Sequence, residues 1–558
     1  MPPPQSDLSQ GTVPAHRSPR PLTAVIATPS LNGTRFERFR ARRGTRVLLL
    51  ALPLLALVSI FTISDLRGVD FGTHWDEDIW QIDPVRQMVQ SGVLLPRASI
   101  YPTLGKWLSF LPSIPAGIRA GFKRGSTPGA VQAAMVAAVN AADYLLTVRR
   151  LYIFVSALAI VWVYGAGLAL RRPWWEALIA ACGLGLSWEY AYHARFVATD
   201  CILVQFSALT LMMLALFFRG GKSGWLYAAA AAAGLGTGTK YPGVILLVPV
   251  MLSGVLTLPA RNLRAQALRL VGIGATAFGV YLLTTPATLL DPFAFADQLG
   301  WISKYYKDGH VGYTVSGAWQ HWRVVLTYFA IAYFSPHRLF SVALFASAVL
   351  GAVAWIRADR RLGSVLLCLP VVFLIYFCGS YRAVIVRNYL FLTPFLALFA
   401  ARGVAEIFGR LPQRWARWPL TGALVLGFAT SAVWLIQAGE GIRHPSRPRD
   451  VQEALAYVAK HPGTKFRLSG QVRALAASEH LILPANVTEK KPFDQVVFFA
   501  RAEGPGDQLW KSNDPWNAKA IFGTREVNFN WYTTWWGPDR IVVMTVAKAK
   551  ATGVALAN

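Results

Sequence analysis

The sequence predicts a mostly α-helical protein that crosses a membrane many times, and three observations lead to this fold class. Of its 558 residues, 54% are hydrophobic and only 15% are charged, whereas soluble chains carry about 25% charged residues. Between residues 47 and 437, apolar runs recur that are long enough to cross a bilayer as helices. Lys and Arg gather in the short loops between these runs, as the positive-inside rule describes. We therefore expect about eleven transmembrane helices.

The charge balance is strongly basic, with 55 Lys and Arg against 28 Asp and Glu, a formal charge of +27. Because many basic residues lie in loops between apolar runs, they indicate topology and attraction to anionic headgroups, and nucleic acid is not expected as a partner. The four cysteines form no CxxC pair and fall in or beside apolar runs, which favours buried, unreactive thiols.

The chain begins with a basic tail, residues 1–46, which is rich in Pro and Ser and contains eight Arg but only two acidic residues. We expect this tail to be disordered and cytoplasmic, and it lacks the features of a secretory signal peptide. The first span, about residues 47–63, then leads into a long outer loop, residues 65–148. Within this loop "WLSFLPSIPAGI" and "TPGAVQAAMVAAVNAADYLL" predict helices that lie in the membrane interface.

The other ten predicted spans are placed by the basic residues that follow or precede them. They cover residues 151–170, 177–192, 201–218, 225–238, 243–258, 270–285, 338–356, 363–380, 388–402 and 418–437. With the N-terminus inside, residues 286–336 form a second outer loop and the last span ends outside. We expect a multi-pass protein of the bacterial inner membrane with a cytoplasmic N-terminus and a periplasmic C-terminal domain.

Residues 438–558 differ from the rest because their apolar runs are shorter and their charge is higher. Helix-like "DVQEALAYVAK" alternates with strand-like "QVVFFA" and "RIVVMTV", which predicts a small α/β domain. Basic residues in it do not contradict an outer location, since long domains translocate largely regardless of charge. The predicted domains are thus a tail (1–46), a transmembrane domain (47–437) and an outer domain (438–558).

Polar residues that stand out against this apolar background fall mostly on the outer side. The stretch "GTHWDEDIWQIDP", residues 72–84, places four acidic residues directly after the first span. The remaining outer-side residues of interest are Lys106, Glu189, His193, Arg195, Asp200, Lys240, Asp291 and His310. Because a charge within the bilayer costs about 2.5–3.5 kcal/mol on insertion scales, such groups line a cavity or form pairs. Ordinary interfacial charges, and a structural pair of Asp200 with Arg195, remain open alternatives.

This combination of residue types suits the transfer of a group away from a phosphate. A carboxylate can accept the proton of an incoming hydroxyl group, while Lys and Arg stabilise the departing phosphate oxygen. No P-loop, GxGxxG fingerprint or zinc-ligand spacing is present in the sequence. The glycines of "GLGTGTK" lie in a predicted span and lack the P-loop ending, so they indicate close helix packing.

Several short motifs in a fixed order resemble one family. They are "DE" after the first span, "YP" later in the same loop, "R…TD" at Arg195 and Asp200, "GLGTGTKYPG", "TTPATLLDPFAFADQL" and "RNYLFLTPFLALFAARG". Together these motifs resemble the polyprenyl-phosphate-sugar-dependent glycosyltransferases of the GT-C type, which include protein O-mannosyltransferases and the lipid A aminoarabinose transferase. The resemblance covers about residues 47–436, and it implies a GT-C fold for the transmembrane domain.

The resemblance also implies roles for individual residues. Asp76 matches the family's general base, and Glu77 is the second acid of "DE". Lys240 and Lys106 are expected at the lipid phosphate, and Arg195 and Asp200 match the "R…D" pair. Tyr101 and His310 complete the residues expected to bind the lipid phosphate or sugar.

Two positions differ from the family patterns. Ile79 stands where the aminoarabinose transferase has Arg, and "RN" replaces "RY" in the last motif.

The predicted function is therefore a glycosyltransferase that moves a sugar from a polyprenyl-phosphate-linked donor to a hydroxyl group of a glycan, lipid or protein at the periplasmic face. The expected partners are that donor, membrane lipid and the acceptor. No cofactor is required, because Lys and Arg can meet the charge of one phosphate; a divalent metal would need Asp76, Glu77 and His310 to converge. The alternatives are a transporter of lipid-linked sugars, or flippase, and a non-catalytic membrane scaffold.

One segment between predicted spans is unusually aromatic. "WISKYYKDGHVGYTVSGAW", residues 301–319, is too polar to cross a membrane. It predicts either an aromatic cover that stacks on a sugar over the site or an ordinary interfacial loop.

Overall fold

The computed structural model describes residues 43–70, 77–93, 95, 100–123, 125–257, 262–309, 314–411, 414–442, 447–499, 519–522 and 541–551. Met1–Ala51 and Leu52–Asn558 are separate units. Of the first unit only the beginning of helix α2 (Arg43–Arg67) is described. Everything below concerns the second unit.

The described chain is mostly helical, and eight of its helices are long and apolar enough to cross a membrane. They are α2, α8 (Tyr144–Ala169), α11 (Thr199–Gly220), α14 (Leu263–Thr284), α18 (Arg338–Ala358), α19 (Arg360–Ser380), α20 (Thr393–Arg410) with the preceding 3-10 turn η5 (Val386–Leu392), and α21 (Arg414–Ile442). The protein is therefore a multi-pass membrane protein, as the apolar runs predict.

The other three predicted spans fall on shorter helices. Residues 177–192 form α9 (Trp174–Gly185) and α10 (Trp188–Ala194), residues 225–238 lie in α12 (Ser223–Thr239), and residues 243–258 form η3 (Tyr241–Leu246) and α13 (Leu247–Leu256). All predicted spans are thus helical, while the number of membrane crossings stays a prediction.

Two breaks between these shorter helices have clear local causes. Ser187 is extended, and its hydroxyl group accepts a hydrogen bond from the backbone N–H of Tyr190, an N-cap that starts α10. Lys240 is also extended, with φ −152° and ψ 132°, and Pro242 follows at the start of η3. Proline is tolerated in a first helical turn because its missing N–H would lack an intrahelical partner there. Because of the second break, Lys240 is the first residue after α12 and its backbone is no longer helical.

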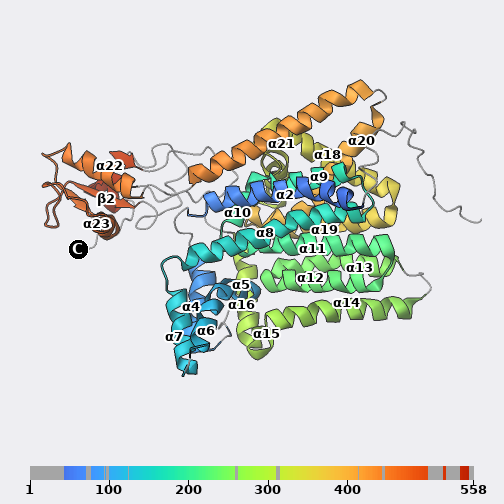
Figure 1. The fold of residues 1–558 in the computed structure, drawn as a ribbon, viewed down its shortest axis with the longest axis horizontal. Helices are drawn as coiled ribbons and strands as arrows, with labels where there is room; N and C mark the ends of the chain where they lie inside the picture. The colour runs from blue at the N-terminus through green and yellow to red at the C-terminus, as the bar shows by residue number, and fades with distance from the viewer. Residues whose placement is uncertain are drawn as a thin grey trace, which may run out of the picture. The chain divides into compact units, whose positions relative to one another are not determined.

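Close helix contacts in the transmembrane domain occur at glycines. Helices α11, α12 and α14 lie side by side (Figure 1), and a Cβ atom on Gly234 of α12 would collide with the carbonyl oxygen of Ala277 in α14. Helices α18 and α20 meet in the same way, at Gly351 against Phe399 and at Gly403 against Ser347. The interpretation of "GLGTG" as a packing motif is therefore confirmed, because small residues let helices approach in a membrane.

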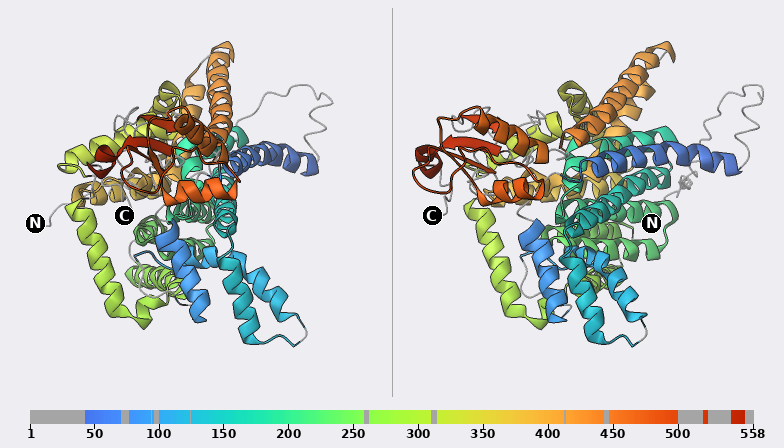
Figure 2. Two further views of the ribbon diagram at one scale, coloured as in Figure 1. Left: turned by 90° about the vertical axis from the view of Figure 1, so that its left-hand side faces the viewer. Right: turned by 60° about the vertical axis from the view of Figure 1, so that its left-hand side comes forward.

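The loop after α2 contains the helices predicted from its apolar segments. After the π-helical turn η1 (Asp78–Ile82) come α4 (Asp83–Ser91), α5 (Leu104–Phe110), α6 (Ile114–Gly121) and α7 (Pro128–Val139). Helices α6 and α7 run side by side as a hairpin, seen in light blue in Figure 2. The second loop contains α15 (Ala287–Leu290), α16 (Pro292–Asp308), α17 (Ala318–Tyr328) and the π-helical turn η4 (Phe329–Tyr333).

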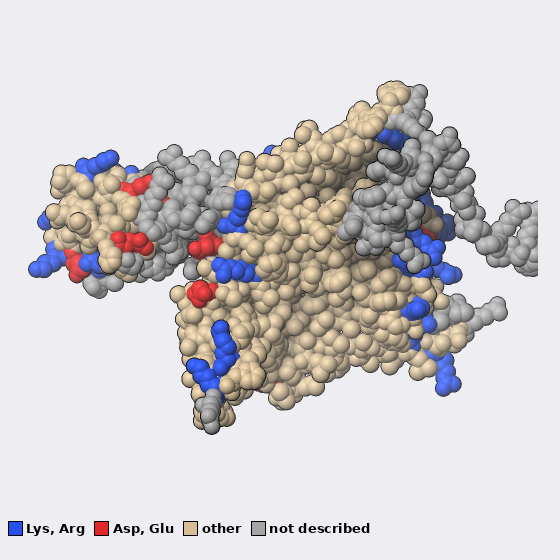
Figure 3. Space-filling model, viewed as in Figure 1, with Lys and Arg blue, Asp and Glu red and all other residues tan. Residues whose placement is uncertain are grey.

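Charge is distributed unevenly over the transmembrane helices. Figure 3 shows a broad surface without Lys, Arg, Asp or Glu along these helices, with charged side chains gathered toward the helix ends. The last turns of α11, α18 and α20 contain Arg219, Arg357 and Arg410. From the positive-inside rule these ends are expected in the cytoplasm, and the side of the membrane that they face stays a prediction.

The described part of residues 447–551 has α/β structure, as predicted. It comprises α22 (Arg447–Ala459), β1 (Phe466–Leu468), α23 (Gly470–Ser478), β2 (Gln495–Phe499), β3 (Ala520–Phe522), β4 (Ile541–Thr545) and α25 (Val546–Ala551). The strand order is β1-β2-β4-β3, with β1 and β2 parallel and the other neighbours antiparallel. Val497 and Val543 pack with α22 and α23, while Val496 and Val542 belong to a second cluster, as the alternation of side chains along a strand requires.

Candidate functional site

A cavity of about 360 Å³ lies in the transmembrane domain next to the break after α12. Its wall is mainly aromatic and aliphatic, with side chains from α16 and α19 and from the segments around η3 and residues 100–101. The aromatic lining residues are Trp80, Tyr101, Tyr241, Trp301, Tyr305, Tyr306, Phe373, Tyr376, Phe377 and Tyr381. Three polar residues stand together on this wall, Lys240, Arg387 and Asn388. The cavity therefore offers an apolar wall and one cationic end.

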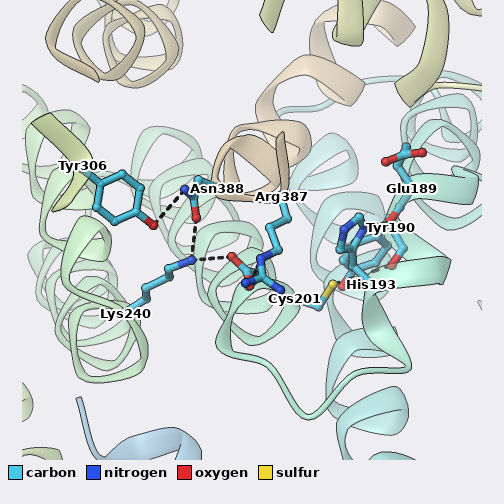
Figure 4. A network of polar contacts seen from close by, with 9 residues as sticks. Glu189, Tyr190, His193, Cys201, Lys240, Tyr306, Arg387 and Asn388 are labelled. Carbon is cyan, nitrogen blue, oxygen red and sulfur yellow. Dashed lines mark hydrogen bonds and ion pairs between the residues drawn. The ribbon is translucent and has the colours of Figure 1, made fainter. Parts of the chain in front are cut away.

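Lys240 is the centre of that cationic end. Its ammonium group donates hydrogen bonds to Oδ1 of Asp200, at 2.6 Å, and to Oδ1 of Asn388, at 2.7 Å. Figure 4 shows these contacts in a line that continues to Tyr306, whose hydroxyl oxygen accepts from Nδ2 of Asn388 at 3.1 Å. Lys240 and Asp200 are both buried, so the charges must be paired, because an unpaired buried charge is costly.

Arg387 supplies a second positive charge. Its Nε lies 3.6 Å from Oδ2 of Asp200, the carboxylate that also pairs with Lys240. Asp200 stands in the first turn of α11, where the helix dipole favours a negative charge. Among the residues that the structure describes, Lys240 and Arg387 thus share the carboxylate of Asp200, and an anion in the cavity would be attracted to both cations.

His193 lies close to this group but adds no charge to it. Its Nδ1 is 2.7 Å from the backbone carbonyl oxygen of Glu189. Burial lowers the pKa of His193 to about 4, and the cations of Arg387 and Lys240 act in the same direction. The imidazole is therefore neutral at physiological pH.

Tyr101 and Lys106, both predicted from the sequence, lie beside the cationic end. Tyr101 lines the cavity, and the Lys240 nitrogen is 5.9 Å from the centre of its ring. Lys106 is buried, and its Nζ is 3.4 Å from the carbonyl oxygen of Tyr101. Burial lowers the pKa of Lys106 to about 7, so this amine is partly neutral at physiological pH.

Glu77 does not line the cavity in this structure. Its two carboxylate oxygens accept from Nε and Nη2 of Arg149, at 2.9 and 2.5 Å, and one of them also accepts from the backbone N–H of Val197. Glu77 and Arg149 are both completely buried. The pair fixes the chain directly after Asp76 against α8 and against the segment that precedes α11.

Arg195 corrects an expectation from the sequence. The motif "R…D" predicts that Arg195 acts together with Asp200, but in the structure Arg195 forms an ion pair with Asp65 of α2, at 2.9 Å. Both side chains are almost completely enclosed, at 1% and 0% exposed, and Arg195 also lies over the ring of Trp188. In the chain, the turn between α10 and α11 separates Arg195 from Asp200. The cation that lies beside the Asp200 carboxylate together with Lys240 is instead Arg387, which is 187 positions later in the chain.

Two predicted residues cannot be placed. Asp76 and His310 both lie outside the described residues. Within the part of the chain that is described, no group of three His, Cys, Asp or Glu side chains could hold a metal ion. The hypothetical metal site of Asp76, Glu77 and His310 is not tested by that result, since two of its members are not described.

Sequence reasoning missed the roles of Arg387 and Asn388 at the cationic end. Both stand in η5, next to the apolar run of α20. The signal was available, because an adjacent Arg and Asn at the end of a predicted span is unusual in a membrane. Tyr306 falls within the aromatic segment 301–319, which was predicted either to cover a site or to be an ordinary loop. In the structure Trp301, Tyr305 and Tyr306 of this segment line the cavity.

Comparison with known proteins gives one family match. Residues 138–297 match the family model described as dolichyl-phosphate-mannose-protein mannosyltransferase. This region includes Lys240 and Asp200 but neither Asp76 nor Arg387. The match lies inside the range over which the sequence resembles this family and confirms the resemblance there. No curated protein sequence matches the chain.

Three solved structures illustrate which proteins the fold is similar to. ArnT from Cupriavidus metallidurans, bound to undecaprenyl phosphate, is 14% identical with a TM-score of 0.43, covering 90% of this chain and 98% of that one. The oligosaccharyltransferase of Archaeoglobus fulgidus in its apo form is 12% identical with a TM-score of 0.44, covering 89% and 77%. The arabinofuranosyltransferase AftD from mycobacteria is 15% identical with a TM-score of 0.39, covering 76% and 29%.

Proposed function

We propose that this protein is a membrane glycosyltransferase that takes its sugar from a polyprenyl-phosphate-linked donor and transfers it to an acceptor hydroxyl group. The observation that carries this proposal is the cavity, which combines an aromatic and aliphatic wall with the cations Lys240 and Arg387. A prenyl-phosphate ester has the same two parts, an apolar tail and one anionic group. The family match over residues 138–297 supports the same class of donor, since that family is named for a dolichyl-phosphate sugar.

The proposed reaction is a single displacement with inversion at the sugar. Asp76 acts as the general base and accepts the proton of the acceptor hydroxyl group as its oxygen attacks the anomeric carbon. The bond from that carbon to the phosphate oxygen breaks, and its electron pair remains on the phosphate. Lys240 and Arg387 stabilise the charge that develops on this leaving group, and Lys106 adds to it when protonated.

The burial of Glu77 suggests a supporting role for this residue. Because its carboxylate is bound to Arg149 and to the backbone of Val197, Glu77 fixes the position of the chain next to Asp76. In this proposal Asp76 touches the acceptor, whereas Glu77 is a positioning residue.

The reaction is proposed to take place on the periplasmic side of a bacterial inner membrane, with the N-terminus in the cytoplasm and residues 438–558 in the periplasm. Basic last turns at the opposite helix ends support this orientation. Single cysteines in place of Ala130 of α7 and Gly224 of α12, introduced after the four native cysteines are removed, test it with an impermeant maleimide. Labelling of the cysteine at 224, and not of that at 130, in intact spheroplasts would reverse the orientation.

Replacing the proposed base tests the reaction. Strains that lack the gene and carry either the unchanged protein or Asp76→Asn are compared by mass spectrometry of their envelope glycans and glycolipids. We expect the sugar to be lost with Asp76→Asn, because one general base contributes about 10²–10⁴-fold in rate, while the amount of protein in the membrane is unchanged. Full modification by Asp76→Asn would exclude Asp76 as the base.

A purified-protein assay separates transfer from transport. When a lipid-linked sugar and an envelope extract that contains acceptor hydroxyl groups are mixed with the protein in detergent, where no second compartment exists, transfer of the sugar to the acceptor with release of free polyprenyl phosphate is expected of a transferase and not of a flippase. A lack of release, together with movement of the lipid-linked sugar across reconstituted vesicles, would favour the transporter instead.

A further inference from the structure

A chain of two hydrogen bonds links Lys240 to helix α16 through Asn388 and Tyr306. The ammonium group of Lys240 has three N–H bonds to donate, and Asp200 and Asn388 accept two of them, at 2.6 and 2.7 Å. Asn388 in turn donates to the hydroxyl oxygen of Tyr306 at 3.1 Å. Figure 4 shows the side chains of Tyr306, Asn388 and Lys240 pointing toward one another from three different segments.

The orientation of the Asn388 amide is set by Lys240. Its oxygen faces the ammonium group, and its NH2 group faces Tyr306. A flipped amide would place N–H donors against an ammonium group, which has no acceptor. The Tyr306 hydroxyl group can donate or accept, and in this orientation its oxygen accepts from the NH2 group. Asn388 is buried, so water offers little replacement for either bond.

Tyr306 also connects α16 to the rest of the domain through its backbone and its ring. Its backbone carbonyl oxygen accepts from the N–H groups of Arg382 and Ala383, both at 3.0 Å, and its ring packs against Phe377 and Tyr381. None of the residues of α16, all of which the structure describes, is buried. Figure 2 shows α16 as the yellow-green helix at the edge of the transmembrane helices. Tyr306 therefore connects the C-terminal part of α16 to residues 377–383, while Phe295 contacts Tyr241 nearer the start of this helix.

We propose that Asn388 and Tyr306 are positioning residues that hold the Lys240 ammonium group in place at the cationic end of the cavity and couple it to α16. This inference rests on the proposed function, because it assigns Lys240 to the lipid phosphate. Lys240 follows the last turn of α12 in an extended conformation, and its side chain contains four rotatable carbon–carbon bonds, so its orientation must come from its partners. In this proposal Asp200 provides the negative charge that pairs with the ammonium group. Asn388, held by Tyr306, fixes the direction in which the Lys240 side chain points.

The test uses full-length protein in detergent and undecaprenyl phosphate as the probe, with Kd as the readout. Tyr306→Phe removes the hydroxyl group and keeps the ring, and we expect it to weaken binding about 3- to 10-fold, the usual effect of one lost hydrogen bond. In a Lys240→Met background the same change should alter Kd less than about 2-fold, because the hydroxyl group acts only through Lys240. Asn388→Ala should show the same dependence on Lys240 and provides a second, independent variant.

Tyr190→Phe is the matched control. It too removes a tyrosine hydrogen bond, the one from the Tyr190 hydroxyl group to the carbonyl oxygen of Ser156 at 2.7 Å, but Tyr190 does not line the cavity. Its Kd should equal that of the unchanged protein. The inference is overturned if Tyr306→Phe and Asn388→Ala bind the probe normally, or weaken binding equally with and without Lys240, as a general effect on the cavity wall would. If the unchanged protein does not bind undecaprenyl phosphate, the proposed function is overturned and this inference with it.

Discussion

Three buried ion pairs among the described residues have different surroundings, and that difference separates structural residues from candidate functional ones. The pairs Glu77–Arg149 and Asp65–Arg195 are enclosed by protein on every side. Lys240 shares Asp200 with Arg387 and faces a cavity. Only the last group can therefore exchange a protein partner for a ligand without unfolding its surroundings.

Arg195 provides a direct test of this distinction. Arg195→Ala leaves the Asp65 carboxylate buried without its ion-pair partner, so we expect the free energy of unfolding to fall by about 3–5 kcal/mol. The double variant Asp65→Ala with Arg195→Ala should be less destabilised than the sum of the two single variants. Thermal unfolding in detergent measures both. An Arg195→Ala protein of normal stability that binds undecaprenyl phosphate weakly would instead place Arg195 at the phosphate, as the motif predicts.

Lys106 predicts a pH dependence. Because burial lowers its pKa to about 7, the amine is charged below this pH and neutral above it. A bound phosphate stabilises the charged form and raises that pKa, so affinity should be highest below about pH 7 and fall by up to about tenfold per pH unit above it. The phosphate itself also titrates, near pH 6. Because this titration affects a Lys106→Met protein equally, the difference between the two pH profiles of Kd reports Lys106 alone. Identical pH profiles of Kd for the two proteins would show that Lys106 does not contact the anion.

At the residue scale, Lys240, Asp200 and Tyr101 could be predicted as site residues from charge or motif alone. Arg387 and Asn388 stand out in the sequence as polar residues at the end of a predicted span, but their partners could not be predicted, because Asn388 is 148 positions from Lys240 in the chain and only the fold brings them together. Arg195 shows the opposite error. It is five positions from Asp200, yet the turn after α10 directs it to α2.

At the scale of helices, apolar runs predict the long helices of the transmembrane domain but not the interruptions inside them. Residues 177–192 are expected to form one span, but the helix is interrupted between Gly185 and Trp188. Ser187 is the N-cap of the second helix. A single Ser inside an apolar run is a weak signal, since Ser is also tolerated inside membrane helices. The break matters because α10, which starts there, contains His193, a neighbour of the cationic end of the cavity.

Glycine contacts between helices yield a prediction about stability. A Cβ atom at Gly351 of α18 would collide with the carbonyl oxygen of Phe399 in α20, so Gly351→Ala should lower the free energy of unfolding by about 1–3 kcal/mol. Gly422→Ala in α21 is the matched control, because no atom lies within 4 Å of its added Cβ. There the higher helix propensity of Ala should leave stability unchanged or raise it by up to about 1 kcal/mol. Equal thermal stability of the two variants in detergent would argue against close packing of α18 on α20.

At the scale of the whole molecule, the sequence predicts both the fold class and the orientation of the helices in the membrane, because both depend on properties of the bilayer. A bilayer requires apolar helices of a certain length, and basic loops are retained in the cytoplasm. The fold class is confirmed by the helices described here, whereas the sidedness and the domain boundaries stay predictions. The chemical identity of the sugar and the acceptor is encoded in local contacts that neither composition nor hydropathy can predict.

In the proposed function, the predicted sidedness and the cavity together would allow the protein to act on a substrate with a long apolar tail. We propose that the tail lies among apolar side chains while the anionic group reaches Lys240 and Arg387 at the break between α12 and η3. The acceptor is proposed to approach from the aqueous side, where Asp76 follows the first span in the sequence. This proposal requires that the lipid phosphate binds at the cationic end of the cavity.

The most direct test of that claim is the Kd of undecaprenyl phosphate for purified Lys240→Met and Arg387→Met. We expect each variant to bind at least about tenfold more weakly than the unchanged protein, because each loses a charge-assisted contact. Lys222→Met, which removes the same charge from an exposed site at the start of α12, should bind normally. Equal Kd values for the unchanged protein, Lys240→Met and Arg387→Met would contradict the account, because the phosphate would then lie elsewhere.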